Sequence, residues 1–362
     1  MKAGCIFVLC IFALAAGFGC MYLLSLHWPK SLQTDPHVQP GPEPPPPDPN
    51  KYLPYVKSLN EFQQKDLPDA YRVTYGFVDY NGNPHHVTCN INKKDHQHEM
   101  DAYGYDDKLF DKLAAQDLAE YFGREIREKD LYPILELQFP SAGRYHWHYQ
   151  IPEGTADWQQ KKEREIKNYL KDFKERVKDR YHLVMNRLLA ERGFQMNDYM
   201  ISINYKDLVL HGQKPLNDCF EQLKESAKKY SERQNLGMYL AFFQEIKYQV
   251  PPDLIDGKDT LGLWVPTEVV ANDHGDCDSK SVAFAAMIKS LGLPSIVISV
   301  PHHALVGVES KPGPDQKFVR VGNRYFILCE VAGPGKWAPG NEGREDVKGT
   351  FEYQMIEPSD SF

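Results

Sequence analysis

Hydrophobic positions are distributed unevenly along the chain, and the longest apolar run comes first. From Gly4 to Leu26 the chain has no charged residue. At about 1.5 Å per helical residue, such a run crosses a hydrocarbon core about 30 Å thick. Lys2 precedes the run and favours a cytoplasmic N-terminus. We predict a transmembrane helix and membrane anchor over residues 1–27. A cleaved signal peptide and a lipoprotein modified at Cys20 are the alternatives, and each also leaves the rest of the chain outside the cytoplasm.

The apolar pattern then gives way to a proline-rich stretch, DPHVQPGPEPPPPDPNKYLP, from Asp35 to Pro54. Proline fixes the φ angle and removes a backbone donor, so this stretch is not expected to join a helix or a sheet. We therefore predict an extended stalk over residues 28–54. Such a stalk would hold the following domain away from the membrane.

Alternating apolar and polar residues begin after the stalk. Residues 71–92 are typical of two strands joined around Asn81, Gly82 and Asn83. A helical pattern follows over 106–128, and the segments YPILELQFP and YHWHYQI indicate two more strands. Together these elements predict a small mixed α/β domain over residues 55–152.

Apolar steps of three and four residues dominate the next part. They predict a long amphipathic helix over residues 158–192 and helical structure over 216–250. A buried helix is predicted over 278–290, with Gly292 at its C-terminal end. Strands are then expected at 295–300 and 302–308, followed by a hairpin over 317–331 that turns at Gly322 and Asn323. These elements define an α+β domain over residues 153–362.

Composition narrows the range of partners. The chain of 362 residues is 42% hydrophobic and 25% charged, with a formal net charge of -8, which is typical of a globular acidic protein. A nucleic-acid partner would require a basic face, and no suitable Lys/Arg block occurs. Of the seven cysteines, four lie outside the apolar run. They could pair in three ways, and the disulfide status of Cys89, Cys219 and Cys329 is left open.

Histidines occur in pairs that invite a metal interpretation. The two pairs His85/His86 and His96/His98 lack a recognised ligand spacing. His146 and His148 lie two residues apart and share one face of a predicted strand. Zinc sites need ligands that converge, so we expect solvated histidines instead. We predict neither a metal nor a cofactor.

The segment GDCDSKS places Cys277 at the N-terminus of the predicted helix over 278–290. Unpaired N–H groups and the helix dipole favour a thiolate there, whereas Asp276 and Asp278 oppose it. Period-two alternation puts Glu330 on the strand face opposite Cys329. A thiolate, an imidazole and a carboxylate acceptor together form the nucleophile, base and orienting group of thiol catalysis.

The ordered set of segments from about Phe243 to Pro339 resembles the transglutaminase-like superfamily, whose members share a papain-like cysteine-protease core. The segments are FQEIKY, WVPTEVV, GDCDSKSVAFAAMIKSLGLP, HHALVGV and YFILCEVAGP. The resemblance implies a helix that carries the cysteine, packed on an antiparallel sheet that carries the histidine and the acid.

Carried over by position, the resemblance implies that Cys277 is the nucleophile and that His303, which Ala follows, is the base. Glu330 stands where the family more often has Asp followed by Pro or Thr, and here Val331 follows. Gln244 lies where an amide that stabilises an oxyanion is expected. His302 competes with His303 but should face away.

These residues predict a membrane-anchored cysteine hydrolase, a peptidase or amidase, that works through a thioester intermediate on the periplasmic or extracellular side. Protein or peptide substrates of the cell envelope are the expected partners. Three alternatives stay open: a protein-glutamine transglutaminase with the same triad, a non-catalytic peptide-binding module, and a redox pair formed by Cys277 and Cys329.

Overall fold

The computed structural model describes residues 38–40, 58–197, 200–252, 254–332, 336–341 and 351–361, with the backbone alone at 38–40, 232 and 233. The predicted anchor and most of the predicted stalk lie outside these residues. None of the described helices has the length and apolarity needed to cross a bilayer. The chain divides into two compact units, which we call the helical unit (residues 107–185) and the core unit (residues 34–106 and 186–362).

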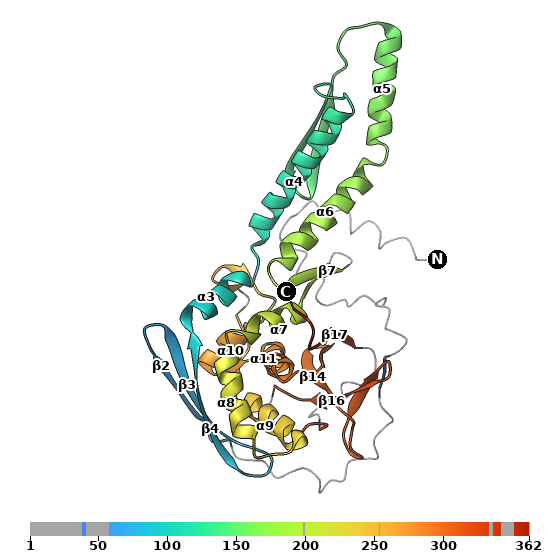
Figure 1. Cartoon of the computed structure of the whole chain (residues 1–362). Coiled ribbons are helices and arrows are strands. Elements are labelled where there is room, and N and C mark those ends of the chain that lie inside the picture. Colours follow the sequence, from blue (N-terminus) through green and yellow to red (C-terminus); the bar gives the residue numbers. More distant parts are fainter. Residues whose placement is uncertain are drawn as a thin grey trace, which may run out of the picture. The chain divides into compact units, whose positions relative to one another are not determined.

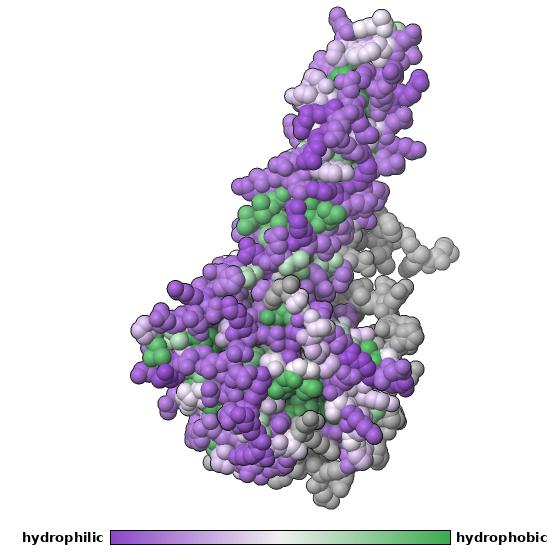
Figure 2. Space-filling model, viewed as in Figure 1, coloured by the Kyte–Doolittle hydropathy of each residue, from purple (hydrophilic) through white to green (hydrophobic). Residues whose placement is uncertain are grey.

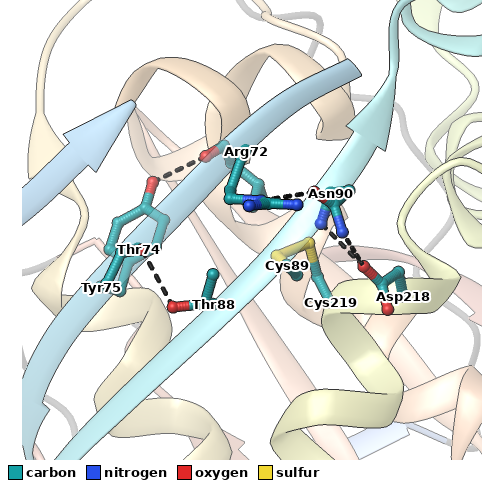
Figure 3. Close-up of a disulfide and its surroundings, with 9 residues drawn as sticks. Arg72, Thr74, Tyr75, Thr88, Cys89, Asn90, Asp218 and Cys219 are labelled. Atoms are coloured by element: carbon teal, nitrogen blue, oxygen red, sulfur yellow. Dashed lines mark hydrogen bonds between the residues drawn. A yellow bond between two sulfur atoms is a disulfide. The ribbon is translucent and has the colours of Figure 1, made fainter. Parts of the chain in front are cut away.

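The predicted α+β class is confirmed, but the units do not follow the predicted boundary near residue 152. Strand β4 (Pro84–Asn92) packs against helix α8 (Asn217–Ala227), and a disulfide between Cys89 and Cys219 joins them (Figure 3). Beside the disulfide, the backbone N–H of Asn90 donates to Asp218 over 2.7 Å. Residues before the helical unit therefore share a core with residues far beyond it, and residues 55–152 are not a domain of their own.

The helical unit confirms the predicted helix and strands between residues 106 and 151. Its elements are α4 (Asp107–Glu128), β5 (Leu135–Ser141), β6 (Arg144–Tyr149), α5 (Ala156–Leu170) and the first part of α6 (Phe173–Ala190). Strands β5 and β6 pair antiparallel. In Figure 2 most of this unit is hydrophilic, with a hydrophobic area on the face shown. Leu109 and Leu113 of α4 are 45% and 36% exposed.

The long helix predicted over 158–192 is interrupted between Leu170 and Phe173. At the break, the Arg176 guanidinium donates to the backbone carbonyl of Tyr169 over 2.8 Å and lies over the Tyr169 ring. The carbonyl thus finds a side-chain partner where the helix ends. Phe173 is buried against Phe122. The apolar steps of three and four residues continue across the break, so helical periodicity alone does not reveal the interruption.

The core unit is built on a six-stranded sheet in which each neighbouring pair is antiparallel, in the order β1-β15-β16-β14-β13-β17. Its strands are β1 (Val38–Pro40), β13 (Ser295–Val300), β14 (His303–Glu309), β15 (Phe318–Val321), β16 (Arg324–Cys329) and β17 (Glu352–Ile356). Residues 295–308 and 317–331 form the strands predicted for them. On one face a hydrophobic cluster includes Ile298, Leu305, Phe326 and Leu328.

Strand β1 corrects the prediction that the proline-rich stretch joins no sheet. Three residues of that stretch pair antiparallel with β15, with Val38 opposite Val321 and Pro40 opposite Val319. An edge strand bonds to one neighbour only, so a proline at its end is tolerated where a central strand would exclude it. The proline content therefore ruled out a central strand and not an edge strand.

Helix α11 (Cys277–Ser290) lies at the centre of the core unit (Figure 1). It contacts β13 and β14 on one side and helices of the second layer on the other. The second layer comprises α7 (Tyr205–Gln213), α8, α9 (Glu232–Glu245) and α10 (Pro266–Asn272). A three-stranded antiparallel sheet of β2 (Glu61–Asp66), β3 (Ala70–Val78) and β4 covers these helices. The layer order is sheet, helices, sheet, and the hairpin predicted over 71–92 supplies two strands of the outer sheet.

Short elements complete the core unit. They are α3 (Lys93–Ala102), the hairpin of β7 (Phe194–Asn197) and β8 (Met200–Ile203), the parallel pair of β9 (Lys247–Tyr248) and β12 (His274–Gly275), and the hairpin of β10 (Leu254–Ile255) and β11 (Lys258–Asp259). The helical structure predicted over 216–250 is α8 and α9, separated at residues 228–231.

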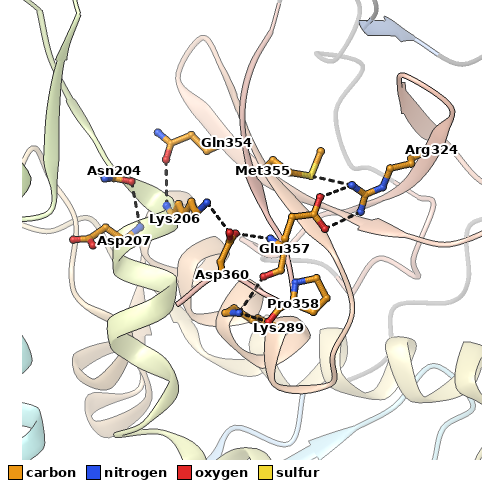
Figure 4. Close-up of polar contacts among 10 residues, drawn as sticks. All are labelled: Asn204, Lys206, Asp207, Lys289, Arg324, Gln354, Met355, Glu357, Pro358 and Asp360. Atoms are coloured by element: carbon orange, nitrogen blue, oxygen red, sulfur yellow. Dashed lines mark hydrogen bonds and ion pairs between the residues drawn. The ribbon is translucent and has the colours of Figure 1, made fainter. Parts of the chain in front are cut away.

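The C-terminal strand is tied to the rest of the core unit by polar contacts around Glu357 and Asp360 (Figure 4). Arg324 binds the carboxylates of both Glu309 and Glu357. Lys289, near the end of α11, donates to the backbone carbonyl of Glu357 over 3.0 Å. These contacts anchor β17 beside β13 and fix the C-terminal end of α11.

Candidate active site

Cys277 is the first residue of α11, and local sequence explains why the helix begins there. Asp276 is the N-cap, and its carboxylate accepts from the backbone N–H of Ser279 over 3.0 Å. Gly275 precedes the cap, and a Cβ at that position would lie 2.8 Å from Lys280 Cγ. The GDC sequence therefore supplies a helix cap and room for a buried lysine, and it places the cysteine on the first turn.

His303 and Glu330 meet at the end of the six-stranded sheet. His303 begins β14, and Glu330 follows the last residue of β16. His303 Nε2 lies 2.7 Å from Glu330 Oε2, and the two side chains are 8% and 6% exposed. When the carboxylate is ionised it only accepts hydrogen bonds, so Nε2 then donates, and a neutral ring has Nδ1 as its acceptor. The predicted pairing of these two residues on one face is present in the structure.

Cys277 contacts residues that follow the two members of this pair in the chain. Its side chain packs with Ala304, which follows His303, and with Ala332. The backbone N–H of Ala332 donates to Glu330 Oε1 over 3.0 Å. Among the described hydrogen bonds none joins His303 to the Cys277 sulfur.

The electrostatic environment of Cys277 differs from the predicted one. Burial raises the pKa of the Cys277 thiol, the charges of Asp278 and Asp276 raise it further, and only a backbone hydrogen bond from Ala304 lowers it. The helix N-terminus, which was expected to favour the thiolate, is outweighed because the sulfur is buried among carboxylates. Burial and the two carboxylates together favour the thiol over the thiolate.

Gln244, predicted to stabilise an oxyanion, has other partners here. Its Nε2 donates to the backbone carbonyls of Glu330 over 2.5 Å and of Trp337 over 3.0 Å. Its Oε1 accepts from the Trp337 N–H and from the hydroxyl of Tyr80. Both amide hydrogens are used, so Gln244 fixes the segment after β16 in this arrangement. An oxyanion role would require one of these bonds to break and stays a prediction.

Lys280 is a site residue that sequence reasoning missed. It is fully buried, and its Nζ donates to the backbone carbonyls of Ile246 over 2.7 Å and of Ala332 over 2.8 Å. Desolvation lowers the pKa of Lys280 to about 7, although neighbouring carboxylates, first Glu330, raise it. The lysine joins α11 to the backbone that holds Glu330. The available signal was a lysine in the first turns of a helix predicted to be buried.

Asp278 and Tyr205 were also missed as a pair. The Cys277 thiol donates to Asp278 Oδ2 over 3.3 Å, and the hydroxyl of Tyr205 donates to Asp278 Oδ1. Tyr205 begins α7 and precedes Asp278 by 73 residues. No local pattern in the sequence connects residues so far apart.

The paired histidines do not converge on a common point. His85 binds Asp79 over 3.0 Å, His86 binds Glu61 over 2.9 Å, and His96 lies 2.9 Å from the hydroxyl of Thr267. The remaining three, His98, His146 and His148, are exposed. Among the described residues, the one group of three candidate ligand atoms within 4.8 Å of one another belongs to Asp276, Cys277 and Asp278.

Thr267 and Glu268, in the segment WVPTEVV, belong to a buried polar group. Thr267 donates from its backbone N–H to Glu99 over 3.1 Å. Glu268 lies between His96 and His274, at 3.4 and 3.2 Å. These contacts hold α3, α10 and the segment leading to Cys277 together.

The cysteines outside the apolar run also divide clearly. Cys89 pairs with Cys219, whereas Cys277 and Cys329 are free and buried. The redox-pair alternative therefore has no disulfide to support it in this structure.

The fold and the site define an α+β protein with a free cysteine at a helix N-terminus beside a buried His–Glu pair. Comparison of the chain with models of known protein families, with curated proteins and with solved structures finds no match.

Proposed function

We propose that this protein is a cysteine hydrolase with a papain-like transglutaminase core that cleaves amide bonds through a thioester on Cys277. The observation that carries the proposal is the His303–Glu330 hydrogen bond of 2.7 Å between buried side chains, next to the cysteine that begins α11. A carboxylate on Nε2 fixes the ring and leaves Nδ1 to exchange a proton with sulfur. The antiparallel sheet and the central α11 are compatible with the proposed core.

The proposed reaction follows from these roles. Cys277 Sγ transfers its proton to His303 and attacks the carbonyl carbon, so that a C–S bond forms and the carbonyl electrons move to oxygen. The C–N bond then breaks, and the leaving amine takes the proton from His303. Water, deprotonated by His303, attacks the thioester and releases the acid and the thiol. Glu330 stabilises the imidazolium in each half-reaction.

The proposed location is the outer face of the inner (cytoplasmic) membrane, with residues 4–26 as the anchor. The buried Cys89–Cys219 disulfide supports this location, because such bonds persist in oxidising compartments. Protein or peptide substrates of the cell envelope are the partners that an enzyme held there would meet.

The test combines a thiol probe with a substrate search on the full chain in detergent. We expect the iodoacetamide labelling rate of Cys277 to fall when His303 is replaced by Asn. Hydrolysis of a defined peptide library, followed by mass spectrometry, should be lost in Cys277→Ala and reduced by about 100-fold or more in His303→Asn.

His302 provides the matched control. It is exposed, with a φ of 62° in the turn before β14, a conformation that Asn adopts readily. His302→Asn should therefore keep both labelling and hydrolysis. If His302→Asn and His303→Asn behaved alike, His303 would lose its role as the base.

Two other functions remain as outcomes of the same test. Transfer to an amine would appear as incorporation of dansylcadaverine into a glutamine-containing peptide, again dependent on Cys277. A non-catalytic peptide-binding module is favoured by the raised pKa of the Cys277 thiol. That function would appear as peptide retention that Cys277→Ala leaves unchanged, with no cleavage in the wild type.

A further inference from the structure

The Cys277 thiol has a proton acceptor that the proposed reaction does not use. Its Sγ donates to Asp278 Oδ2 over 3.3 Å, and no hydrogen bond to His303 is present among the described contacts. The acceptor is the next residue in α11, so both groups lie on the first turn of the same helix. The thiol therefore donates its proton toward a carboxylate in this structure.

Asp278 is itself held in place from another helix. The hydroxyl of Tyr205 donates to Asp278 Oδ1, and Ser299 Oγ donates to the Tyr205 oxygen over 3.5 Å. Tyr205 is 8% exposed, and both its burial and the charge of Asp278 raise the pKa of its hydroxyl. The hydroxyl thus stays protonated and donates at neutral pH. The carboxylate has one oxygen on a fixed donor and the other on the thiol.

Titratable groups surround this chain of hydrogen bonds on several elements. They are Asp276, Asp278 and Lys280 on α11, Tyr205 on α7, Tyr103 after α3, His303 on β14 and Glu330 after β16. Lys280 is bound to two backbone carbonyls, so it is not placed to neutralise Asp278. A thiolate formed beside Asp278 would face an uncompensated negative charge at close range.

We propose that Asp278, held by Tyr205, is the resting acceptor of the Cys277 proton and keeps the nucleophile protonated until their hydrogen bond breaks. The proton then passes from Sγ to His303, and the vacated Asp278 oxygen returns to solvent. This regulation rests on the proposed function, because it matters only if Cys277 is a nucleophile. The protonation of the Cys277 thiol can nevertheless be measured without any substrate. Asp278 and Tyr205 are positioning residues in this scheme.

The test is the pH dependence of iodoacetamide labelling of the Cys277 peptide, followed by mass spectrometry on the full chain. Asp278→Asn keeps the shape of the side chain and removes its charge. We expect it to lower the apparent pKa of the thiol by one unit or more, which is about a tenfold faster labelling rate at pH 7. Tyr205→Phe, which releases Asp278 from its donor, should produce a smaller acceleration.

Asp276→Asn is the control for charge alone, because Asn also caps a helix and Asp276 does not bind the thiol. It should accelerate labelling less than Asp278→Asn. Tyr103→Phe, which removes a buried hydroxyl bonded to the Thr260 carbonyl, controls for the loss of a tyrosine hydroxyl and should leave the rate unchanged.

Unchanged or slower labelling in both Asp278→Asn and Tyr205→Phe, with thermal unfolding like that of the wild type, would overturn the proposal. Should Asp278→Asn fail to fold, Tyr205→Phe against Tyr103→Phe decides the question. The His303→Asn variant separates this proposal from the proposed function. Faster labelling in Asp278→Asn supports the role of Asp278 even if His303→Asn has no effect, a result that would count against catalysis by His303.

Discussion

At the residue scale, the core unit buries ionisable side chains in its interior. Glu99 is 3% exposed and accepts from Thr267, while Lys280 is fully buried beside carboxylates and carbonyls. Burial raises the pKa of Glu99 to about 7, and desolvation lowers the pKa of Lys280 to about 7. Each group is therefore close to a change of charge at neutral pH, and the stability of the fold must depend on pH.

The Glu99 contribution has a definite sign. Between an unfolded pKa of about 4.3 and the folded value of about 7, the folded protein keeps a proton that the unfolded chain has lost. Stability should fall as pH rises through this window, by up to about 4 kcal/mol. Glu99→Gln, which resembles the protonated acid, should remove this part of the fall and be more stable than the wild type at pH 8. Urea unfolding at pH 5 and pH 8 measures the difference.

Two other groups shape the same pH profile. Asp276, whose pKa burial raises to about 6, adds a fall of the same sign that Glu99→Gln leaves in place. Lys280 acts in the opposite direction, because above pH 7 the unfolded chain binds a proton that the folded protein has lost. A wild-type profile that rose steadily from pH 5 to pH 7 would contradict the assignment for Glu99.

At the element scale, α11 depends on its first turn. The Asp276 side chain accepts from both the backbone N–H and the hydroxyl of Ser279. We expect Asp276→Ala to lower the free energy of unfolding by about 1 kcal/mol, since the cap and a partner for a buried N–H are lost. Asp276→Asn should lose clearly less. Urea unfolding at pH 7 measures both, and equal losses would mean that the cap is not the source of the effect.

The same scale shows what the sequence could predict. Period-two alternation and turn residues were sufficient for the hairpins, and the strand ends brought His303 and Glu330 together. The contacts of Gln244, Lys280 and Tyr205 reach across 34 to 164 residues, so no periodicity contains them. Two other features depend on burial between distant segments. One is the helix break before Phe173, and the other is the packing of β2–β4 into one core with the C-terminal half of the chain. Sequence reasoning thus found the proposed reacting groups and missed the residues that hold them.

At the scale of the whole molecule, one covalent link closes a long loop of the chain. The Cys89–Cys219 bond joins residues 130 positions apart, and both cysteines are 1% exposed. Closing so long a loop in the unfolded chain costs conformational entropy, so replacing both cysteines by Ala should lower the free energy of unfolding by about 3–5 kcal/mol. Urea unfolding without reductant measures the loss.

Dithiothreitol should lower the stability of the wild type toward that of the double variant and leave the double variant unchanged. Cys329→Ala is the control for removal of a buried sulfur that forms no bond. If it cost as much as the double variant, packing and not the cross-link would account for the loss.

The position of this bond has a consequence for cleavage of the chain. The helical unit lies wholly between Cys89 and Cys219, so a cut within residues 107–185 leaves two polypeptides that stay joined. One carries the predicted anchor, and the other carries Cys277, His303 and Glu330. The two sulfur atoms then become the sole covalent tether between them. After cleavage, the fragment with Cys277, His303 and Glu330 would stay attached to the anchor fragment through the Cys89–Cys219 bond. Only a reducing agent would then break this covalent link.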